Sequence, residues 1–498
     1  MEANGKSRPS GGVKPLVAVA GITLVAALLR LASLWDAFWL DEIWSLRLAS
    51  TTDSALGVFT SIHHDNNHYL NTFWLRALGG DAPWALYRAP AFLAGVATVM
   101  LAGGMESRRG LGPGLLAAAL FGLSYPFVHY STEARGYGLV VLLALAAYVV
   151  LERLHREGRA RDAAVFAFLA SIGFLAHLTF LTVYLPLLTW SVWATVARRD
   201  PLRRALRTAA AHFIPLALLL VLILVDIRHL VRGGGPELLP LRGWLEAWAY
   251  TLGLPLNGAT ALVLVLGLAF GAAVLVGLWE TTRREPAAWV FLGLVLVFPL
   301  ALLIGLRTGY APPRYFLASL TFGLLLVGRG LTCMLQGRRL TRFLAVGLLL
   351  VAVVGNGWRV ARFVDDGRGR YQEVVAYLAS HTEADTIRVA SDYDFGASMV
   401  LGYYEKFLPA SKELAYLSGE GPTGSADWYL VHELGDQFDP PEILEVGVGD
   451  GYVLQETFPK FGLSGWNWAL YRRGRSLPRE LQGRQPSEGS PYDMVEGS

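Results

Sequence analysis

The sequence contains few charged residues and almost no cysteine. Of its 498 residues only 17% are charged while 53% are hydrophobic, and the mean hydropathy is +0.40. A typical soluble domain carries about 25% charged residues, so this composition excludes an ordinary soluble protein. The single cysteine, Cys333, excludes an intrachain disulfide framework and makes a thiolate metal site implausible. The small formal charge of +3 gives no reason to expect a nucleic-acid partner.

Long apolar runs dominate the first three quarters of the chain. A helix that crosses a bilayer needs about 20 mostly apolar residues, and by this criterion the sequence predicts about eleven such helices. They are expected near residues 15–34, 84–104, 112–130, 136–152, 162–176, 179–197, 209–227, 259–279, 287–306, 315–335 and 341–358. The fold class is therefore a polytopic α-helical membrane protein.

Arginines mark every second connection between these runs. They are Arg108 and Arg109; Arg153, Arg156, Arg159 and Arg161; Arg198, Arg199, Arg203, Arg204 and Arg207; Arg283 and Arg284; and Arg338, Arg339 and Arg342. Because basic loops stay in the cytoplasm, we expect the N-terminus there and the first run to be a retained anchor. The segments 35–83, 131–135, 228–258 and 307–314 and the chain after about 359 are then extracytoplasmic.

The chain after residue 358 has a mixed composition. YQEVVAYLASH is typical of an amphipathic helix, and TIRVASDYD, DWYLVHEL, GYVLQETF and WALYRR are typical of strands. We therefore expect a membrane domain over 1–358, including the outer loop 35–83 with short interfacial helices at 53–61 and 67–79. An exported α/β domain follows over 359–478. Residues 479–498 are polar and rich in Gly, Pro and Ser, which predicts a disordered tail.

Two adjacent carboxylates, Asp41 and Glu42, follow the first apolar run within FWLDEIWSL. Charges at membrane depth and beside aromatic rings are costly, so the pair is more easily explained by chemistry than by solvation. A structural alternative is that Asp41 caps a helix and Glu42 lies in its first turn. The two interpretations are compatible, because a carboxylate at a helix start can accept a proton from an alcohol or amine.

The stretch SIHHDNNHYL concentrates imidazole, carboxylate and amide groups in the same loop. Such a set could hold a divalent cation or give the directional hydrogen bonds that a sugar requires, and a solvated polar loop needs neither. Candidate metal ligands are Glu42, His63, His64 and His68.

Arg135 and Arg314 stand in motif-like surroundings at the expected outer ends of helices. Arg135 lies in a short turn, STEARGYG, and Arg314 begins a helix after two prolines in GYAPPRYFL. A guanidinium offers several donors in a planar fork and stays charged, which suits the phosphate of an anionic lipid. The alternative for each is an interfacial anchor beside tyrosine.

At these residues the chain resembles the GT-C superfamily of integral membrane glycosyltransferases, in the branch of protein O-mannosyltransferases and lipid A aminoarabinose transferases. The resemblance rests on the acidic pair, the HHDNNHYL stretch, the EARGY turn, PPRYFL and a soluble part that begins YQEVVAYL. It implies that a sugar is transferred, with inversion, from a polyprenyl-phosphate donor to a lipid, protein or glycan acceptor on the extracytoplasmic side of the membrane. We expect this membrane to be the bacterial plasma membrane.

The resemblance also implies residue roles. Asp41 is the expected general base, and Glu42 supports the site or a bound cation. Arg135, Arg314 and Arg88 are expected to bind the donor phosphate. The expected substrate-binding residues are His64, Asp65, Asn67, His68, Tyr69, Glu133, Tyr137 and Tyr315. Many relatives have a His-Pro-Pro type sequence where this chain has His64, Asp65, Asn66, Asn67 and His68, which leaves the acceptor and any metal requirement open.

Two other function classes compete with an enzyme. A transporter or flippase of polyprenyl-linked lipids would be expected to carry polar or broken helices at mid-membrane, whereas the mid-span residues here are Leu, Val and Ala. A surface-glycan binding protein would need only one anchoring span. The expected partners are the lipid-linked donor, the acceptor and membrane lipids.

Overall fold

The structure is a computed structural model that describes residues 13–231, 233–235, 237–255, 260–284, 287–418, 426–435, 438–446 and 450–474. The predicted tail 479–498 lies outside these residues. The chain divides into two compact units. The membrane unit comprises the chain up to Leu34 and Leu48–Ala361, and the second unit comprises Trp35–Arg47 and the chain from Arg362 onward. The segment that carries the acidic pair is thus grouped with the C-terminal domain and not with the helices on either side of it.

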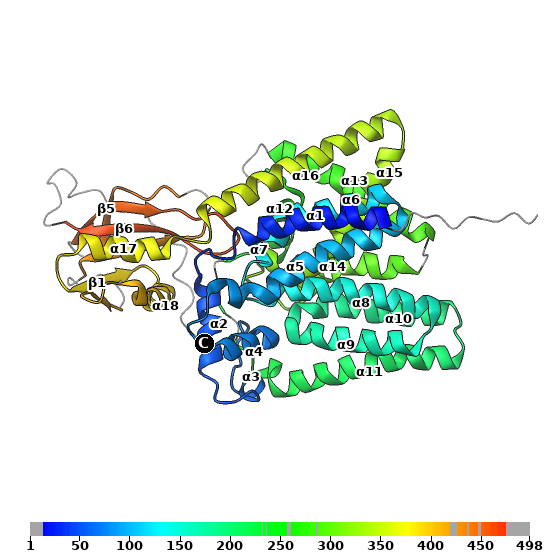
Figure 1. Cartoon of the computed structure of the whole chain (residues 1–498), viewed down its shortest axis with the longest axis horizontal. Helices are drawn as coiled ribbons and strands as arrows, with labels where there is room; N and C mark the ends of the chain where they lie inside the picture. The colour runs from blue at the N-terminus through cyan, green and yellow to red at the C-terminus, as the bar shows by residue number, and fades with distance from the viewer. Residues whose placement is uncertain are drawn as a thin grey trace, which may run out of the picture. The chain divides into compact units, whose positions relative to one another are not determined.

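The membrane unit is helical (Figure 1). Its helices are α1 (Val13–Leu31), α3 (Gly57–Thr60), α4 (Tyr69–Leu78), α5 (Trp84–Glu106), η1 (Ser107–Arg109), α6 (Leu111–Leu123), α7 (Tyr125–Tyr130), α8 (Tyr137–Glu157), α9 (Ala160–Ala176), η2 (Leu178–Phe180), α10 (Leu181–Ala197), α11 (Leu202–Val225), η3 (Ile227–His229), α12 (Pro240–Leu252), α13 (Thr260–Arg284), α14 (Ala288–Gly305), η4 (Pro313–Phe316), α15 (Leu317–Gln336) and α16 (Arg339–Asp366), the last of which crosses into the second unit.

Each of the eleven predicted apolar segments is helical, but the segment 112–130 is divided at Ser124 into α6 and α7, and the predicted number of crossing helices is larger than the described part of the chain supports. Among the described residues, eight helical segments are long and apolar enough to cross a membrane, and α1 and α6 are shorter apolar helices. Backbone polar groups must be satisfied within a segment in lipid, which is why such runs become helices. Large apolar side chains stay exposed on the outer helices, for example Leu268 of α13 at 75% and Leu340 of α16 at 80%. The protein is therefore an integral membrane protein.

Helices α15 and α8 form the centre of the membrane unit, because their apolar windows are 89% and 72% buried. Helices α1, α5 and α6 pack as one group, and α8 to α11 lie side by side (Figure 1). Helix α13 meets α15 backbone to backbone at Gly277 and Gly330, where an added Cβ would overlap a carbonyl of the other helix. In lipid no hydrophobic driving force brings helices together, so small residues that let two backbones pack closely stabilise such crossings.

One buried ion pair ties three of these helices together. Arg329 of α15 donates to the Glu106 carboxylate of α5 from Nε at 3.0 Å and Nη2 at 2.7 Å, and to Thr281 Oγ1 of α13 at 2.9 Å. Both charged side chains are almost fully buried. The pair fixes the relative positions of α5, α13 and α15.

The outer segments contain helices that the sequence predicted only in part. The expected interfacial helices at 53–61 and 67–79 are confirmed as α3 and α4. Helix α12 falls within 228–258, for which we predicted no helix. It begins with Pro240 at its first position, where proline is favoured, and its 13 residues are too short to cross a bilayer.

The second unit contains α2 (Leu40–Ser50, its last three residues in the membrane unit), α17 (Tyr371–His381), α18 (Asp394–Tyr404), η5 (Glu405–Phe407) and six strands. The strands are β1 (Thr386–Ser391), β2 (Glu413–Tyr416), β3 (Trp428–Glu433), β4 (Ile443–Val446), β5 (Asp450–Phe458) and β6 (Asn467–Arg473), in the order β2-β1-β3-β6-β5-β4. Strands β2, β1 and β3 are parallel and the rest pair antiparallel (Figure 1). The predicted α/β domain, its helix at 371–381 and its four strands are confirmed.

Candidate active site

The EARGY turn joins α7 to α8 and is buried throughout. Asn71 of α4 donates from Nδ2 to the carbonyl of Ala134 at 2.6 Å, which fastens the turn to the outer loop. Gly136 ends the turn against the last residue of α9, since a Cβ there would overlap the carbonyl oxygen of Ala176. The turn is therefore held from two sides, and the position of Arg135 is fixed with it.

Arg135 and His68 meet inside the membrane unit. The Nη2 atom of Arg135 lies 3.3 Å from Nε2 of His68, whose Nδ1 accepts a hydrogen bond from the backbone N–H of Gly136 at 3.0 Å. Tyr137 packs under both groups, with its ring 5.3 Å from the guanidinium carbon and 5.4 Å from the His68 ring. Three predicted site residues, His68, Arg135 and Tyr137, are thus in direct contact.

His177 joins this cluster, and the sequence did not identify it as a site residue. It lies in the connection between α9 and α10, with its ring centroid 4.2 Å from that of His68 and 4.4 Å from that of Tyr137. As expected of a helix-end residue, its Nδ1 accepts from the backbone N–H of Thr179 at 3.0 Å. Its Nε2 is buried and has no hydrogen-bond partner among the described residues. A lone histidine between two apolar runs was the available signal.

Arg314 reaches the same cluster from η4. Its guanidinium carbon lies 5.9 Å from the ring of Tyr310 and 6.0 Å from that of Tyr315. Burial lowers the pKa of His68 well below its usual value, and the charges of His177, Arg135 and Arg314 lower it further. Burial likewise lowers the pKa of His177 to about 3, with Arg135 and Arg314 acting in the same direction. The charges of the two arginines therefore lower the pKa values of the same two imidazoles, His68 and His177.

Asp65 supplies a negative charge next to these cations. Burial alone raises the pKa of its carboxyl, but hydrogen bonds from His64 and the backbone of Gly233, with the charges of His64 and Arg135, lower the pKa below its usual value. The backbone N–H of Asp65 donates to the carbonyl of Val231 at 3.0 Å, so this carboxylate is held between two outer loops. Asp65 is ionised and partly exposed, as a polar substrate contact requires.

Other polar residues of the loop hold the loop itself. Asn67 donates from Nδ2 to the carbonyls of Val58 and Ile62 at 2.7 and 3.0 Å, and its Oδ1 accepts from Thr72.

The carboxylate of Asp226, at the end of α11, contacts two further loop residues. Its Oδ1 lies 2.7 Å from His63 Nδ1, and its Oδ2 accepts from Tyr69 Oη at 2.6 Å. Substrate contacts by Asn67 and Tyr69 stay predictions, because the described hydrogen bonds of both side chains are to protein groups.

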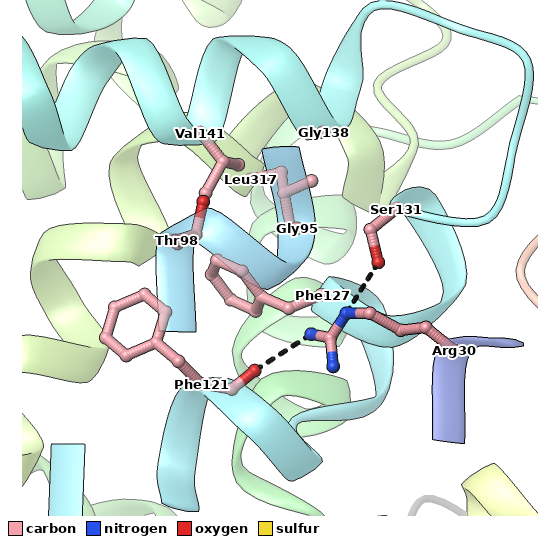
Figure 2. A pocket seen from close by; sticks show the side chains of 9 residues that line it. All are labelled: Arg30, Gly95, Thr98, Phe121, Phe127, Ser131, Gly138, Val141 and Leu317. Atoms are coloured by element: carbon pink, nitrogen blue, oxygen red, sulfur yellow. Dashed lines mark hydrogen bonds between the residues drawn. The ribbon is translucent and has the colours of Figure 1, made fainter. Parts of the chain in front are cut away.

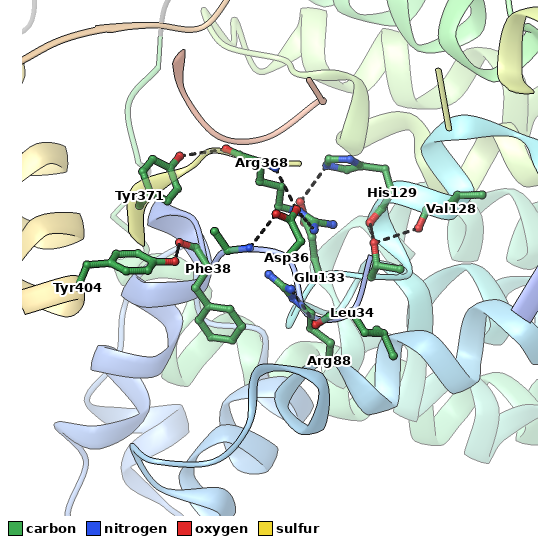
Figure 3. A network of polar contacts seen from close by, with 12 residues as sticks. Leu34, Asp36, Phe38, Arg88, Val128, His129, Glu133, Arg368, Tyr371 and Tyr404 are labelled. Carbon is green, nitrogen blue, oxygen red and sulfur yellow. Dashed lines mark hydrogen bonds and ion pairs between the residues drawn. The ribbon is translucent and has the colours of Figure 1, made fainter. Parts of the chain in front are cut away.

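Glu133 and Arg88 are fully buried in the membrane unit. Glu133 Oε1 lies 3.1 Å from His129 Nε2, and Arg88 Nη1 donates to the carbonyl of Leu34 at 3.0 Å (Figure 3). Neither arrangement tests the substrate role of Glu133 or the phosphate role of Arg88, which stay predictions.

The acidic pair lies in the first turn of α2, which begins at Leu40. Asp41 is therefore inside the helix, one residue past the capping position, where a carboxylate is still favoured by the helix dipole. Glu42 is fully buried and Asp41 is half-buried. Within the second unit, the accessible carboxylate of the pair is Asp41.

The chain before α2 is bonded into the C-terminal domain (Figure 3). The Asp36 carboxylate accepts from the backbone N–H of Arg368 at 2.9 Å and from its Nη1 at 3.1 Å. The carbonyl of Phe38 accepts from Tyr404 Oη at 2.9 Å.

Helix α2 itself also packs on this domain, through Trp44 and Phe395, whose rings meet edge to face at 4.8 Å. The C-terminal domain thus positions the segment that carries Asp41 and Glu42.

At least two of the four candidate metal ligands already have protein partners. Both nitrogens of His68 face N–H donors, and His63 is paired with Asp226. Within the described ranges, no group of three or more His, Cys, Asp or Glu side chains could hold a metal ion. We derive no catalytic step through a metal.

A small cavity elsewhere in the membrane unit is lined by Arg30 (Figure 2). The guanidinium donates to Ser131 Oγ at 2.9 Å and to the carbonyls of Ala26, Gly122 and Phe121 at 3.0, 3.0 and 3.1 Å. A cavity of about 10 Å³ holds about one water molecule. Arg30 is an internal crosslink here and not a lipid-phosphate ligand.

Comparison with known proteins shows the fold. No protein-family model and no curated protein sequence matches the chain. Among solved structures, it is similar to the oligosaccharyltransferase of Archaeoglobus fulgidus in the apo form, with a TM-score of 0.50 and 11% identity, over 80% of this chain and 64% of that one. The fold of the chain is therefore similar to that of this oligosaccharyltransferase. The predicted fold class is confirmed.

Two structures of ArnT from Cupriavidus metallidurans are also similar. The apo form has a TM-score of 0.48 with 13% identity, and the form bound to undecaprenyl phosphate has a TM-score of 0.45 with 14% identity. Each match covers 84% of this chain and 92% of the ArnT chain. The chain spans 64% of the length of the oligosaccharyltransferase, so likeness in fold carries no activity over by itself.

Proposed function

We propose that the protein transfers a sugar from a polyprenyl-phosphate-linked donor to a lipid, protein or glycan acceptor, with inversion at the anomeric carbon. In this reaction the acceptor hydroxyl or amine forms a bond to the anomeric carbon and gives its proton to Asp41. The bond between that carbon and the phosphate oxygen breaks, and its electron pair leaves with the phosphate. Arg135 and Arg314 stabilise the negative charge that develops on the phosphate.

The observation that carries this proposal is that the charges of Arg135 and Arg314 both lower the pKa values of one pair of buried histidines, His68 and His177. Two guanidinium groups near one buried cluster give it a positive potential, which favours the binding of an anionic phosphate. Tyr315 and Tyr137 pack beside these guanidinium groups. Asp65 offers an ionised acceptor for a sugar hydroxyl in the same region.

The two residues of the acidic pair, Asp41 and Glu42, have different roles. Asp41 is the half-buried carboxylate that an acceptor can reach, whereas Glu42 is fully buried and supports the site. The same assignment follows from the resemblance described above. We further propose that the N-terminus is cytoplasmic and that the C-terminal domain is extracytoplasmic, in a bacterial plasma membrane, as the arginine-rich connections indicate.

The test is donor turnover by the purified protein in nanodiscs. A panel of polyprenyl-phosphate sugars is incubated with the protein, with and without chelator, and release of the polyprenyl phosphate is followed. We expect turnover of one donor class, unaffected by chelator, and binding of undecaprenyl phosphate that Arg135→Ala weakens at least tenfold.

Arg242→Ala is the matched control, because this exposed arginine of α12 pairs with Glu246 at 2.9 Å outside the cluster. Equal binding by the wild type and Arg135→Ala would contradict the proposal. Movement of the lipid across the bilayer without sugar release would favour a flippase.

A further inference from the structure

We propose that His68 and His177 are a neutral pair of N–H donors that binds the phosphoryl group of the lipid, next to the two arginines. This inference rests on the proposed function and names which groups, beyond the guanidiniums, complete the phosphate site. Neither histidine was predicted to play this part.

The tautomer of His68 is fixed by the backbone. Its Nδ1 accepts from the N–H of Gly136 at 3.0 Å, so Nδ1 carries no proton and the ring proton of the neutral imidazole is on Nε2. Nε2 lies 3.3 Å from Nη2 of Arg135. The Nε2–H group of His68 therefore lies beside the guanidinium as a second donor, so an acceptor placed there can take hydrogen bonds from both groups. An anionic oxygen is such an acceptor.

The tautomer of His177 is fixed in the same way. The backbone N–H of Thr179 donates to its Nδ1 at 3.0 Å, which places the ring proton on Nε2. That N–H is buried and has no hydrogen-bond partner in the part of the chain that the structure describes. A buried donor without a partner is destabilising, and a bound anion removes that cost.

One tetrahedral anion can reach both rings. The ring centroids of His68 and His177 are 4.2 Å apart, and two oxygens of one phosphoryl group, each at about 2.8 Å from its donor, span a larger separation. Both side chains are more than nine-tenths buried. The cations Arg135 and Arg314 and the carboxylate of Asp65 are the charged groups that act on this pair. The arginines supply charge, and the imidazoles supply directed N–H groups without adding charge.

This geometry disfavours a charged imidazole. Protonation of His68 Nδ1 would set an N–H against the backbone N–H of Gly136, which removes one hydrogen bond and adds a repulsive contact. At His177 the added proton would also face the backbone N–H of Thr179, although the Thr179 hydroxyl, 2.9 Å from Nδ1, can accept it. The pair therefore donates as neutral groups at neutral and mildly acidic pH. A divalent cation is excluded at the same atoms, because both Nε2 atoms carry protons.

Two matched substitutions distinguish the proposed donor, His177 Nε2, from the acceptor, Nδ1, that caps the next helix. In His177→Asn the side-chain oxygen replaces Nδ1 and keeps the acceptor for Thr179, but no group replaces the Nε2 donor. In His177→Gln the amide reaches the Nε2 position and can donate there. The assay is binding of undecaprenyl phosphate to the full-length protein in nanodiscs, with undecaprenol and inorganic phosphate as competitors and the thermal midpoint measured for every variant.

We expect His177→Asn to retain the wild-type thermal midpoint and to bind undecaprenyl phosphate about tenfold more weakly, while His177→Gln binds within about threefold of wild type. His68→Asn should behave like His177→Asn. Undecaprenol should not compete; competition by inorganic phosphate alone, as strong as that of the lipid, would show that the site takes a free phosphate.

The outcomes distinguish this inference from the proposed function. If His177→Asn and His68→Asn bind as tightly as wild type while Arg135→Ala loses binding, the imidazole pair is packing only and the inference is wrong. If Arg135→Ala also binds like wild type, the phosphate site itself is wrong. Loss of binding in His177→Asn together with a lowered thermal midpoint, and no recovery in His177→Gln, would assign the histidine to folding and overturn the inference.

Discussion

Gly136→Ala should move the arginine of the EARGY turn without changing any charged group. A Cβ at this position would lie 3.0 Å from the carbonyl carbon of Ala176 and closer still to its oxygen, and 3.4 Å from Cβ of His68. Carbon atoms in contact sit about 3.5–4.0 Å apart, so the turn and the end of α9 must separate by roughly 1 Å. The residue before the added methyl is Arg135, and the residue after Ala176 is His177.

Such overpacking typically costs about 1–3 kcal/mol of the free energy of unfolding. A displacement of about 1 Å in a positioning group can cost about 100-fold in rate. We therefore expect Gly136→Ala to fold with a lowered thermal midpoint in detergent and to lose about two orders of magnitude in the rate of sugar transfer. The assay is polyprenyl phosphate release under saturating donor.

The control is Gly293→Ala in α14, where an added Cβ meets no atom within 4 Å. This variant should keep both the thermal midpoint and the transfer rate, because alanine is the better helix former. Wild-type transfer by Gly136→Ala, at a wild-type thermal midpoint, would refute the view that the turn is held rigidly between α4 and α9.

Three further predictions concern stability and the second unit. Arg329→Ala removes both hydrogen bonds to Glu106 Oε1 and leaves this buried carboxylate with Arg109 alone, whose Nε lies 3.4 Å from Oε2. We expect the free energy of unfolding to fall by about 3 kcal/mol, and an unchanged denaturation midpoint would contradict this. The pKa of His177 is lowered from 6.5 to about 3 in the folded state, so between these values the unfolded chain binds a proton that the native state does not. His177 should therefore contribute a fall of about 1.4 kcal/mol per pH unit in the free energy of unfolding between pH 6 and 4, and His177→Asn should reduce the measured slope by about that amount. His68, whose pKa is lowered in the same direction, adds to the slope in both proteins, and an unchanged slope in His177→Asn would contradict this prediction. Arg368→Ala removes the side-chain bond to Asp36 and keeps the backbone bond, and it should slow transfer about tenfold while leaving undecaprenyl phosphate binding unchanged; a loss of binding instead would place the C-terminal domain in donor recognition.

The order of the helices was predictable because length and hydrophobicity alone decide which segments can cross a bilayer. The elements that were missed, α12, α18, β2 and β4, are short, and tertiary packing decides their burial. Helix α18, for example, has an apolar surface that packs on α17 and β1, but its sequence, DFGASMVLGYY, shows no clear helical period. Local patterns cannot find an element whose partners are distant in the chain.

The candidate site was predictable by residue type but not by arrangement. Arg135 and Arg314 were each predicted from their motifs, and only the fold brings both to one pair of histidines. Asn67 and Tyr69 look like ligand-binding residues in the sequence, yet they fasten the loop, because the same hydrogen-bonding groups serve both purposes. A single histidine at a helix end usually accepts a hydrogen bond from the first backbone N–H groups of the next helix, so His177 was not identified as a site residue. That role accounts for Nδ1 but not for Nε2.

The account depends most on Asp41 as the group that takes the acceptor's proton. The direct measurement is sugar transfer by purified Asp41→Asn, beside its binding of undecaprenyl phosphate and its thermal midpoint. Since a general base contributes about 10²–10⁴-fold in rate, we expect transfer to fall to the background of the assay while binding and stability stay at wild-type values. Transfer by Asp41→Asn at the wild-type rate would contradict the catalytic assignment.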